Sequence, residues 1–152
     1  MSDAHNLQRF VDAQEGVFPR VLAELAAGEK RSHWIWFVFP QIRGLGYSAT
    51  AERYAIASRD EAAAYAAHDV LGPRLRQCTQ LVLDVEGRSA AEVFGHPDDW
   101  KFRSSMTLFT ACAEDGTIFR SALEKYFAGA PDQRTLDILG QGHGAESVRG
   151  HH

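Results

Sequence analysis

Apolar residues recur every three or four positions along most of the chain, which is the spacing of one face of an α-helix. Between Pro73 and Gly87, for example, Leu75, Cys78 and Val82 share such a face. A helix tolerates proline in its first turn and often ends at glycine. The pattern therefore predicts one helix between these two residues.

Residues that favour helix N-termini stand before most of the other periodic stretches. Ser89 and Glu92 have the spacing of a capping box, and they surround the start of a short apolar run. The alanine-rich stretches 51–58 and 60–68 have high helix propensity. The residues predicted to cap or open the other helices are Asn6, Ser32, Asp60, Asp98 or Asp99, Thr117 and Asp132.

The stretch 33–46, HWIWFVFPQIRGLG, is unusual because aromatic residues stand beside a histidine, a glutamine and an arginine. A proline follows the last aromatic residue and ends any helix there. By periodicity alone, residues 34–39 fit a buried strand as well as a buried helix, since short apolar runs do not distinguish the two. We favour a short buried helix, with Trp34, Phe37 and Phe39 in the core.

No alternation of strands with helices, no internal repeat and no low-complexity linker interrupts the helical pattern. A chain of 152 residues has the size of one domain with a sizeable core. We therefore expect a mainly α fold, a compact single-domain, multi-helix orthogonal bundle with little or no sheet. The domain is predicted over residues 4–140. Residues 141–152, which are poor in apolar residues, are predicted to form a flexible C-terminal tail.

Composition narrows the classes of function. The formal net charge of -4 argues against generic nucleic-acid binding, which needs an excess of lysine and arginine. No apolar run approaches the roughly 18 residues of a membrane-spanning helix. Two isolated cysteines and no charged-then-apolar leader suggest a cytoplasmic protein. No histidines are paired at helical i,i+4 spacing beside a carboxylate, so neither a metal nor a cofactor is expected.

The segment GLGYSA, residues 44–49, matches the GxGxxA form of the dinucleotide-binding fingerprint. That fingerprint also requires a second parallel strand with an acidic residue about 20 positions further on. Here the corresponding position falls in an alanine-rich helix. We therefore interpret Gly44 and Gly46 as a turn that allows the backbone to approach another group closely.

Polar residues interrupt one flank of the predicted helix in WKFRSSMTLF. Lys101, Ser104 and Ser105 share that flank, whereas Phe102 and Met106 share another and are expected in the core. A lysine and hydroxyl groups near a helix start suit an anion such as phosphate or carboxylate. A solvated helix face explains the same residues equally well.

Glu52 and Tyr54 follow the glycine turn. A glutamate there can act as a general acid or base only if it is buried among aromatic residues. An exposed carboxylate that favours the helix dipole is the simpler interpretation. His33 also has two interpretations, a partly buried histidine bonded to backbone or a ligand-binding residue.

Several segments, in their order along the chain, resemble the domain of unknown function 1810 family. They are HWIWFVFPQIRGLG, AERYAI, EAAAYAAHDVLGPRL, EVFGHPDDWKFRSSMTLF and DQRTLDILG. The match covers nearly the whole predicted domain, and SHWIWFVFPQ together with KFRSSMTLF makes it specific. Members of this family are compact and mainly helical, so the resemblance implies such a fold.

A more distant resemblance is to the NADAR superfamily, whose members act on ADP-ribose linked through an N-glycosidic bond. The start of a helix with a glutamate and a tyrosine in that superfamily is similar to AERYAIAS here. The resemblance implies a catalytic role for Glu52 and a neighbouring aromatic role for Tyr54. The chain departs from the superfamily at the closing loop, where it offers only LGQGHG.

These observations lead to the hypothesis of a cleft that binds a nucleotide or an ADP-ribose-like ligand. If Glu52 handles the proton in cleavage of an N-glycosidic bond, the protein is an N-glycosidase. The alternative is a non-catalytic module that binds a small ligand or another protein, and the sequence leaves this choice and the oligomeric state open. The predicted ligand-binding residues are His33, Trp36, Gln41, Arg43, Gly44, Gly46, Tyr54, Lys101, Ser104 and Ser105.

Overall fold

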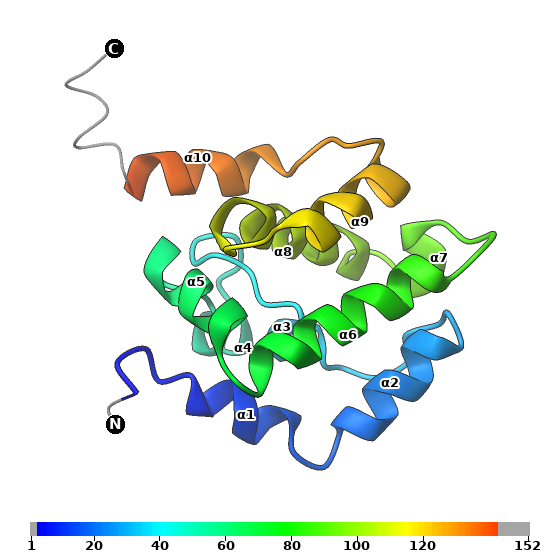
Figure 1. Ribbon diagram of the computed structural model, residues 1–152, viewed down its shortest axis with the longest axis horizontal. Coiled ribbons are helices and arrows are strands. Elements are labelled where there is room, and N and C mark those ends of the chain that lie inside the picture. The colour runs from blue at the N-terminus through cyan, green and yellow to red at the C-terminus, as the bar shows by residue number, and fades with distance from the viewer. Residues whose placement is uncertain (1–2, 143–152) are drawn as a thin grey trace.

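The computed structural model describes residues 3–142, which form ten α-helices and no strand (Figure 1). The predicted mainly α fold is confirmed, and the stretch after Trp34 is a short helix rather than a strand. The helices are α1 (Gln8–Gln14), α2 (Phe18–Ala26), α3 (Ile35–Val38), α4 (Ala49–Arg53), α5 (Arg59–Ala67), α6 (Leu71–Asp84), α7 (Ala90–Phe94), α8 (Asp98–Cys112), α9 (Thr117–Phe127) and α10 (Gln133–Gly142).

Helix α8 is the central element of the bundle and contacts α3, α5, α7, α9 and α10. In Figure 1, α9 and α10 lie on one side of α8, and α1 and α2 lie on the opposite side of the molecule. The sequence of α8 explains this position, because Phe102, Met106 and Phe109 recur at helical spacing and are all fully buried. Burial of Phe102 and Met106 confirms the predicted core flank.

Aromatic rings connect the unusual stretch 33–46 to α8. The ring centroids of Phe39 and Phe102 are 4.9 Å apart, and those of Phe102 and Phe94 are 4.5 Å apart. Trp34 and Phe39 are fully buried, whereas Phe37 is only half-buried. The expectation that this stretch anchors the core is confirmed for Trp34 and Phe39.

Two helix starts follow the sequence signals closely. At α7, the Glu92 amide donates to the Ser89 hydroxyl and the Ser89 amide donates to the Glu92 carboxylate, which completes the predicted capping box. At α10, the Thr135 amide donates to the Asp132 carboxylate over 3.0 Å. Both signals involve residues three positions apart, so the local sequence alone determines them.

Four predicted caps are wrong, because none of these side chains accepts a hydrogen bond from an amide at its helix start. Asp3, not Asn6, accepts the hydrogen bonds of two amides at the start of α1. Ser58, not Asp60, accepts the amide hydrogen bond at the start of α5.

The other two wrong caps are Ser32 and Thr117. Ser32 donates its hydroxyl to Glu24 of α2, and α3 has no side-chain cap. At α9, the Thr117 amide donates to Asp115, so Thr117 is itself the residue that is capped.

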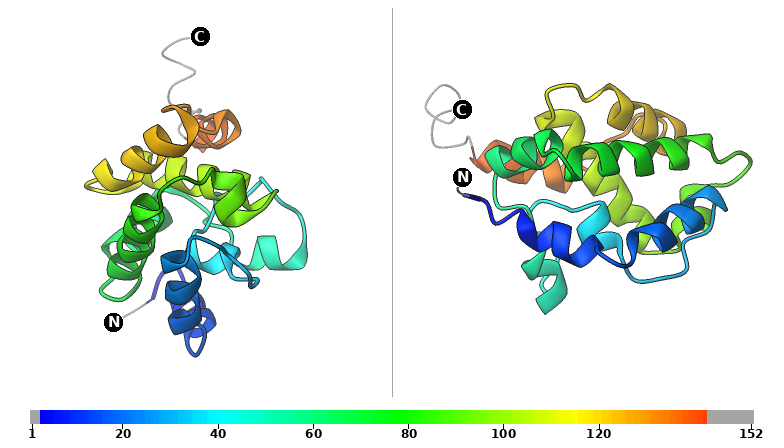
Figure 2. Two further views of the ribbon diagram at one scale, coloured as in Figure 1. Left: turned by 90° about the vertical axis from the view of Figure 1, so that its right-hand side faces the viewer. Right: turned by 60° about the horizontal axis from the view of Figure 1, so that its bottom comes forward.

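Residues 43–55 form a loop whose two ends lie side by side at the body of the domain. The Arg43 amide donates to the Ile56 carbonyl over 2.7 Å, and the Ile56 amide donates to the Gln41 carbonyl over 2.8 Å. These bonds form an isolated parallel bridge between Ile42 and Ile56. We call residues 43–55 the excursion; it contains α4, none of whose residues is buried, and α4 protrudes from the bundle in Figure 2.

The predicted C-terminal tail, residues 141–152, overlaps the last helix. Helix α10 continues to Gly142, so the first two residues of the predicted tail are helical. The rest of the predicted tail, residues 143–152, lies outside the described residues. Among residues 3–142, no helix is long and apolar enough to cross a membrane.

Candidate functional site

A cleft of about 360 Å³ lies between two walls. One wall is formed by α3, the segment that follows it and the excursion. The other is formed by the first two turns of α8, the start of α10 and the residues that directly precede these two helices. The lining residues of the first wall are Trp36, Gln41, Leu45, Gly46 and Ala51, and those of the second are Pro97, Trp100, Lys101, Arg103, Ser104, Asp132 and Arg134.

Lys101 links the two walls. Its Nζ lies 4.9 Å from the centroid of the Trp36 ring, within the range of a cation–π interaction. The same Nζ lies 3.2 Å from Oδ1 of Asp98, whose Oδ2 lies 2.7 Å from Nζ of the nearly buried Lys30. One carboxylate therefore faces two ammonium groups, and this three-residue group retains a net positive charge next to the Trp36 ring.

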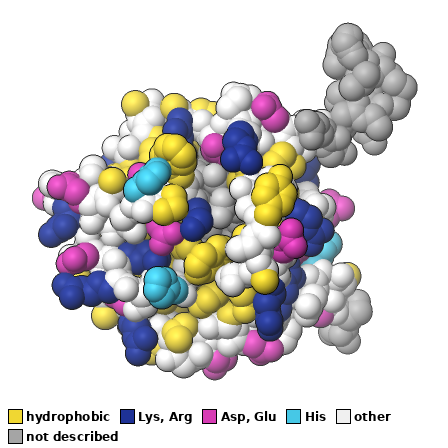
Figure 3. Space-filling model, turned by 180° about the vertical axis from the view of Figure 1, so that it is seen from behind, with side chains coloured by type: hydrophobic (Ala, Val, Ile, Leu, Met, Phe, Trp, Pro, Cys, Tyr) yellow, Lys and Arg dark blue, Asp and Glu magenta, His cyan; other side chains and the backbone are white. Residues whose placement is uncertain are grey.

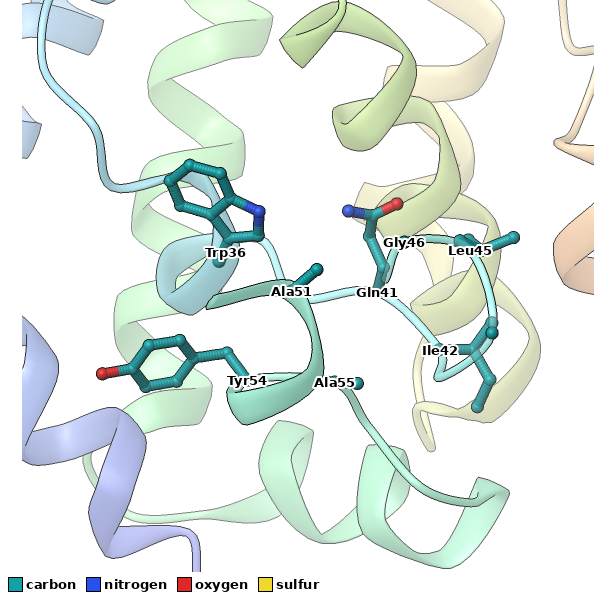
Figure 4. A pocket seen from close by; sticks show the side chains of 9 residues that line it. Trp36, Gln41, Ile42, Leu45, Gly46, Ala51, Tyr54 and Ala55 are labelled. Carbon is teal, nitrogen blue, oxygen red and sulfur yellow. The ribbon is translucent and has the colours of Figure 1, made fainter. Parts of the chain in front are cut away.

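The first wall presents an indole and an amide. In Figure 4, the side chains of Trp36 and Gln41 extend to the same side of the chain, whereas the Tyr54 ring points away from them. Neither the indole nitrogen of Trp36 nor the side-chain amide of Gln41 has a hydrogen-bond partner among residues 3–142. The cleft therefore offers an aromatic ring and unpaired polar groups close together.

The position of α3 depends on Glu24, which is buried in α2. Its carboxylate accepts hydrogen bonds from the Arg31 and Ser32 amides, the Ser32 hydroxyl and the Trp34 indole. Burial raises the pKa of Glu24, but these hydrogen bonds outweigh burial and lower the pKa to about 2. The charged carboxylate thus fixes the segment that leads into α3 and Trp36.

The second wall carries further cations. The Arg103 guanidinium donates to the carbonyls of Ala130 and Pro131, so it ties α8 to the segment before α10. The exposed Arg134 has no ion pair or hydrogen bond within the described part of the chain. Trp100 is 62% exposed, and its ring meets the His96 ring edge-on at 4.6 Å. On the face seen in Figure 3, hydrophobic and basic side chains lie side by side around a hollow.

Five of the predicted ligand-binding residues line this cleft: Trp36, Gln41, Gly46, Lys101 and Ser104. Two others, Gly44 and Tyr54, line a much smaller hollow next to it, which shares Trp36 and Gln41 with the cleft (Figure 4). The structure thus brings together the glycine turn, the aromatic stretch and one flank of α8, although they are far apart in the sequence.

The predicted convergence of the remaining residues is not found. Glu52 and His33 are exposed and are not among the lining residues, and Glu52 lacks the burial on which its proposed acid–base role depends. Arg43 lines a different concavity, which it shares with Arg53. Ser105 is fully buried, and its hydroxyl has no hydrogen-bond partner among the described residues.

Sequence reasoning missed seven of the lining residues: Leu45, Ala51, Pro97, Trp100, Arg103, Asp132 and Arg134. The sequence predicted Asp132 only as the residue that opens α10, and its carboxylate does accept a hydrogen bond from the Thr135 amide there. Its second role follows from tertiary structure, because the Ser104 hydroxyl of α8 donates to the Asp132 carboxylate over 3.1 Å. No local pattern places α10 beside α8.

The described residues offer little support for metal or thiol chemistry. No group of three or more potential metal ligands occurs among residues 3–142. Burial raises the pKa of Cys78 to about 12 and also raises the pKa of Cys112. Neither cysteine is therefore a thiolate at neutral pH, which is the form that acts as a nucleophile.

The fold and cleft define a class of protein: a mainly helical single domain with an aromatic and cationic cleft on one side of its central helix. The chain belongs to the family described as "Protein of unknown function (DUF1810)", which matches residues 4–139. A solved relative is the conserved hypothetical protein Rv1873 from Mycobacterium tuberculosis. Its sequence is 54% identical to that of this chain, and the two structures align with a TM-score of 0.90. The alignment covers 91% of this chain and 99% of that chain.

The comparison with curated proteins gives no match. The resemblance to the domain of unknown function 1810 family is thus confirmed. The more distant resemblance to the NADAR superfamily is not shown by these comparisons.

Proposed function

We propose that the cleft binds a small anionic molecule with a planar ring, of which a nucleotide is the type that fits best. The observation that carries this proposal is the position of Lys101, whose ammonium lies 4.9 Å from the centre of the Trp36 ring inside a cleft. An aromatic ring and a fixed cation at this separation suit a base and a phosphate of one ligand.

The charges of the lining residues support an anionic ligand. Lys101, Arg103 and Arg134 contribute three positive charges and Asp132 one negative charge, so the lining has a formal charge of 3 − 1 = +2. This local excess contrasts with the net charge of -4 of the whole chain. A cleft lined by one sign of charge attracts ligands of the opposite sign.

The volume of the cleft supports a small ligand. Ligand pockets typically span about 300–1,000 Å³, and this cleft of about 360 Å³ lies near the lower end. A mononucleotide therefore fits the proposal better than a complete ADP-ribose. An ADP-ribose-like ligand remains part of the proposal if one of its two halves extends out of the cleft.

Hydrolysis of an N-glycosidic bond is the catalytic form of the proposal. It assigns proton transfer to Glu52, which directly follows the lining residue Ala51. Because Glu52 is exposed, this form requires α4 to turn toward the cleft when a ligand binds.

The binding proposal is tested by calorimetric titration with AMP, ADP and ADP-ribose. Lys101→Met removes the charge but keeps an apolar side chain over Trp36. We expect this substitution to weaken AMP binding by about 10- to 100-fold, the usual effect of losing a hydrogen bond to a charged group. Arg120→Met is the matched control, because Arg120 is exposed on α9 and outside the cleft.

Equal loss of affinity in both variants would show that net charge, not the cleft, attracts the ligand. Absence of binding to all three ligands would overturn the proposal. It would favour the interaction module, for which the exposed rings of Tyr47 and Trp100 provide the apolar surface.

Catalysis is tested separately by chromatography of N-glycosidically linked ADP-ribose substrates after incubation with the protein. The catalytic form predicts release of ADP-ribose by the unaltered protein and none by Glu52→Gln, with binding retained in both. Turnover that survives in the Glu52→Gln variant would exclude Glu52 as the proton-transfer group.

A further inference from the structure

We infer that Asp132 determines which ligands the cleft accepts, by accepting a hydrogen bond from a hydroxyl group of the ligand's ribose. The inference rests on the proposed function and adds the substrate class, a ribonucleotide rather than any planar anion. Asp132 is half-buried, lines the cleft and directly precedes α10.

The two carboxylate oxygens of Asp132 are in different situations. Oδ2 accepts three hydrogen bonds, from the Thr135 amide over 3.0 Å, the Thr135 hydroxyl over 2.5 Å and the Ser104 hydroxyl over 3.1 Å. Oδ1 accepts no hydrogen bond from residues 3–142. Capping of α10 and the link to α8 therefore occupy only one oxygen of the carboxylate.

The carboxylate is held rigidly. The Asp132 amide donates to the Thr107 hydroxyl over 2.8 Å, and that hydroxyl donates in turn to the Arg103 carbonyl over 2.8 Å. Thr107 and Ser104 both belong to the buried face of α8. Asp132, a residue that lines the cleft, is thus fixed to the central helix by its backbone and its side chain, which restricts the position of its second oxygen.

The protein itself does not supply a donor to Oδ1. Two cations of α8 lie close to Ser104 in the sequence, and both are engaged elsewhere. Arg103 donates to the Ala130 and Pro131 carbonyls, and the Lys101 ammonium contacts Asp98 and the Trp36 ring. An ionised carboxylate oxygen accepts hydrogen bonds but cannot donate them. Oδ1 therefore repels a phosphate oxygen and attracts a hydroxyl or amino group.

These preferences orient the ligand. Its phosphate is attracted to Lys101 and Arg134, and its neutral donor groups are attracted to Asp132. A ribose diol supplies such donors between a base and a phosphate, and carboxylates bind ribose hydroxyls in other nucleotide sites. Inorganic phosphate and planar carboxylates without hydroxyl groups satisfy the cations but leave Oδ1 unused.

The test compares AMP with 2′,3′-dideoxy-AMP, which has the same base and phosphate but no ribose hydroxyls. Calorimetric titration of the unaltered protein is expected to give an affinity for AMP about 10- to 100-fold higher, the usual effect of a hydrogen bond to a charged group. The variant Asp132→Asn keeps one oxygen for the Ser104 and Thr135 donors and replaces the other by an NH2 donor. We expect this variant to lose most of its preference for AMP, because only a neutral hydrogen bond to the ribose remains, and to keep its affinity for the dideoxy ligand.

The outcomes separate the inference from the proposed function. If the unaltered protein binds both ligands equally well, the role of Asp132 is overturned and the nucleotide cleft is retained. If it binds neither, both are overturned. A purely structural role for Asp132 would lower both affinities together in the Asn variant, which also overturns the inference. Should the Asn variant not fold, Asp132→Ser, which keeps a side-chain oxygen for the cap of α10, takes its place in the comparison.

Discussion

The two walls of the cleft are built in opposite ways. Helix α8 contacts five other helices and buries most of its residues, including the polar Ser104 and Thr107. The excursion, residues 43–55, is held at its two ends by the bridge between Ile42 and Ile56, and its helix α4 buries no residue. Both walls nevertheless contribute side chains to the same cleft.

The difference shows how a small helical domain can combine a fixed site with an adaptable one. Lys101, Arg103 and Asp132 lie on or are bonded to the central helix, so their geometry is set by the packing of the whole domain. The excursion has few buried contacts, and segments of this kind open locally with low free energy. A ligand that enters the cleft therefore meets groups attached to the core on one side, and on the other side Trp36 next to the less buried excursion.

The largest effect is expected from a core residue of α8. The Phe102 ring packs against Phe94 and Phe39 and is fully buried, so Phe102→Ala should lower the free energy of unfolding by about 3–5 kcal/mol. The control on the other wall is Tyr47→Ala, whose ring is 78% exposed and whose loss should change stability by less than about 0.5 kcal/mol. Chemical denaturation measures both, and similar effects would remove the contrast between the walls.

A smaller effect, which depends on pH, is expected for the stability contributed by Glu24, the residue that holds the segment before α3. The folded-state pKa of Glu24, about 2, lies below its ordinary value of 4.5. The charged carboxylate therefore stabilises the fold above pH 4.5, and this contribution is lost as the pH falls from about 4.5 to about 2. The lost stability should reach about 3 kcal/mol, at 1.36 kcal/mol per pKa unit.

The pH dependence can be assigned by comparing two variants in acid denaturation. Glu24→Gln should remove this part of the dependence, because it has no carboxylate to protonate. Glu52→Gln changes an exposed carboxylate of α4 and should leave the profile unchanged. If the profile of Glu24→Gln matches that of the unaltered protein, Glu24 does not fix the segment before α3 through its charge.

The smallest of the three effects is expected where the excursion begins. Gly44 has φ +108°, a conformation that side-chain-bearing residues rarely adopt, and a Cβ there would lie 3.2 Å from Cδ1 of Ile138. Gly44→Ala should therefore destabilise the protein by about 1–3 kcal/mol, measured by thermal or chemical unfolding. Gly140→Ala is the control, because this glycine lies in α10 at an ordinary φ with open space around it and should be neutral or stabilising. An unchanged stability for Gly44→Ala would mean that the excursion's entry is free to rearrange.

The sequence predicted the helical body well because its signals are local. Leu75, Cys78 and Val82 lie on the buried face of α6, and the Ser89 capping box starts α7 as expected. The predicted cap at Asn6 failed because the carboxylate of Asp3 accepts the hydrogen bonds at that helix start, and the predicted cap at Ser32 failed because its hydroxyl donates to Glu24 of α2. Such competition depends on the folded structure and leaves no periodic pattern.

The candidate site was predicted only in part for the same reason. Lys101 was singled out because a polar residue interrupts the apolar helical pattern there, and Trp36 because it offers an aromatic face beside the polar residues of its stretch. The two do lie together in the cleft. Glu52 was proposed from its position after the glycine turn and from resemblance. In α4, a helix of five residues, the local pattern does not determine which side faces inward. Asp132 has a complete local explanation as a helix cap, which concealed its place in the cleft.

The bridge between Ile42 and Ile56 also bears on how the length of this protein can vary. Because the excursion starts and ends at the same two hydrogen bonds, residues inserted between Gly46 and Ala49 do not displace the segments on either side. Closing a flexible loop of twice the length costs only about 0.6 kcal/mol more. The depth and reach of the cleft can therefore change through insertion or deletion in this one segment, while the sequence of α8 stays constant.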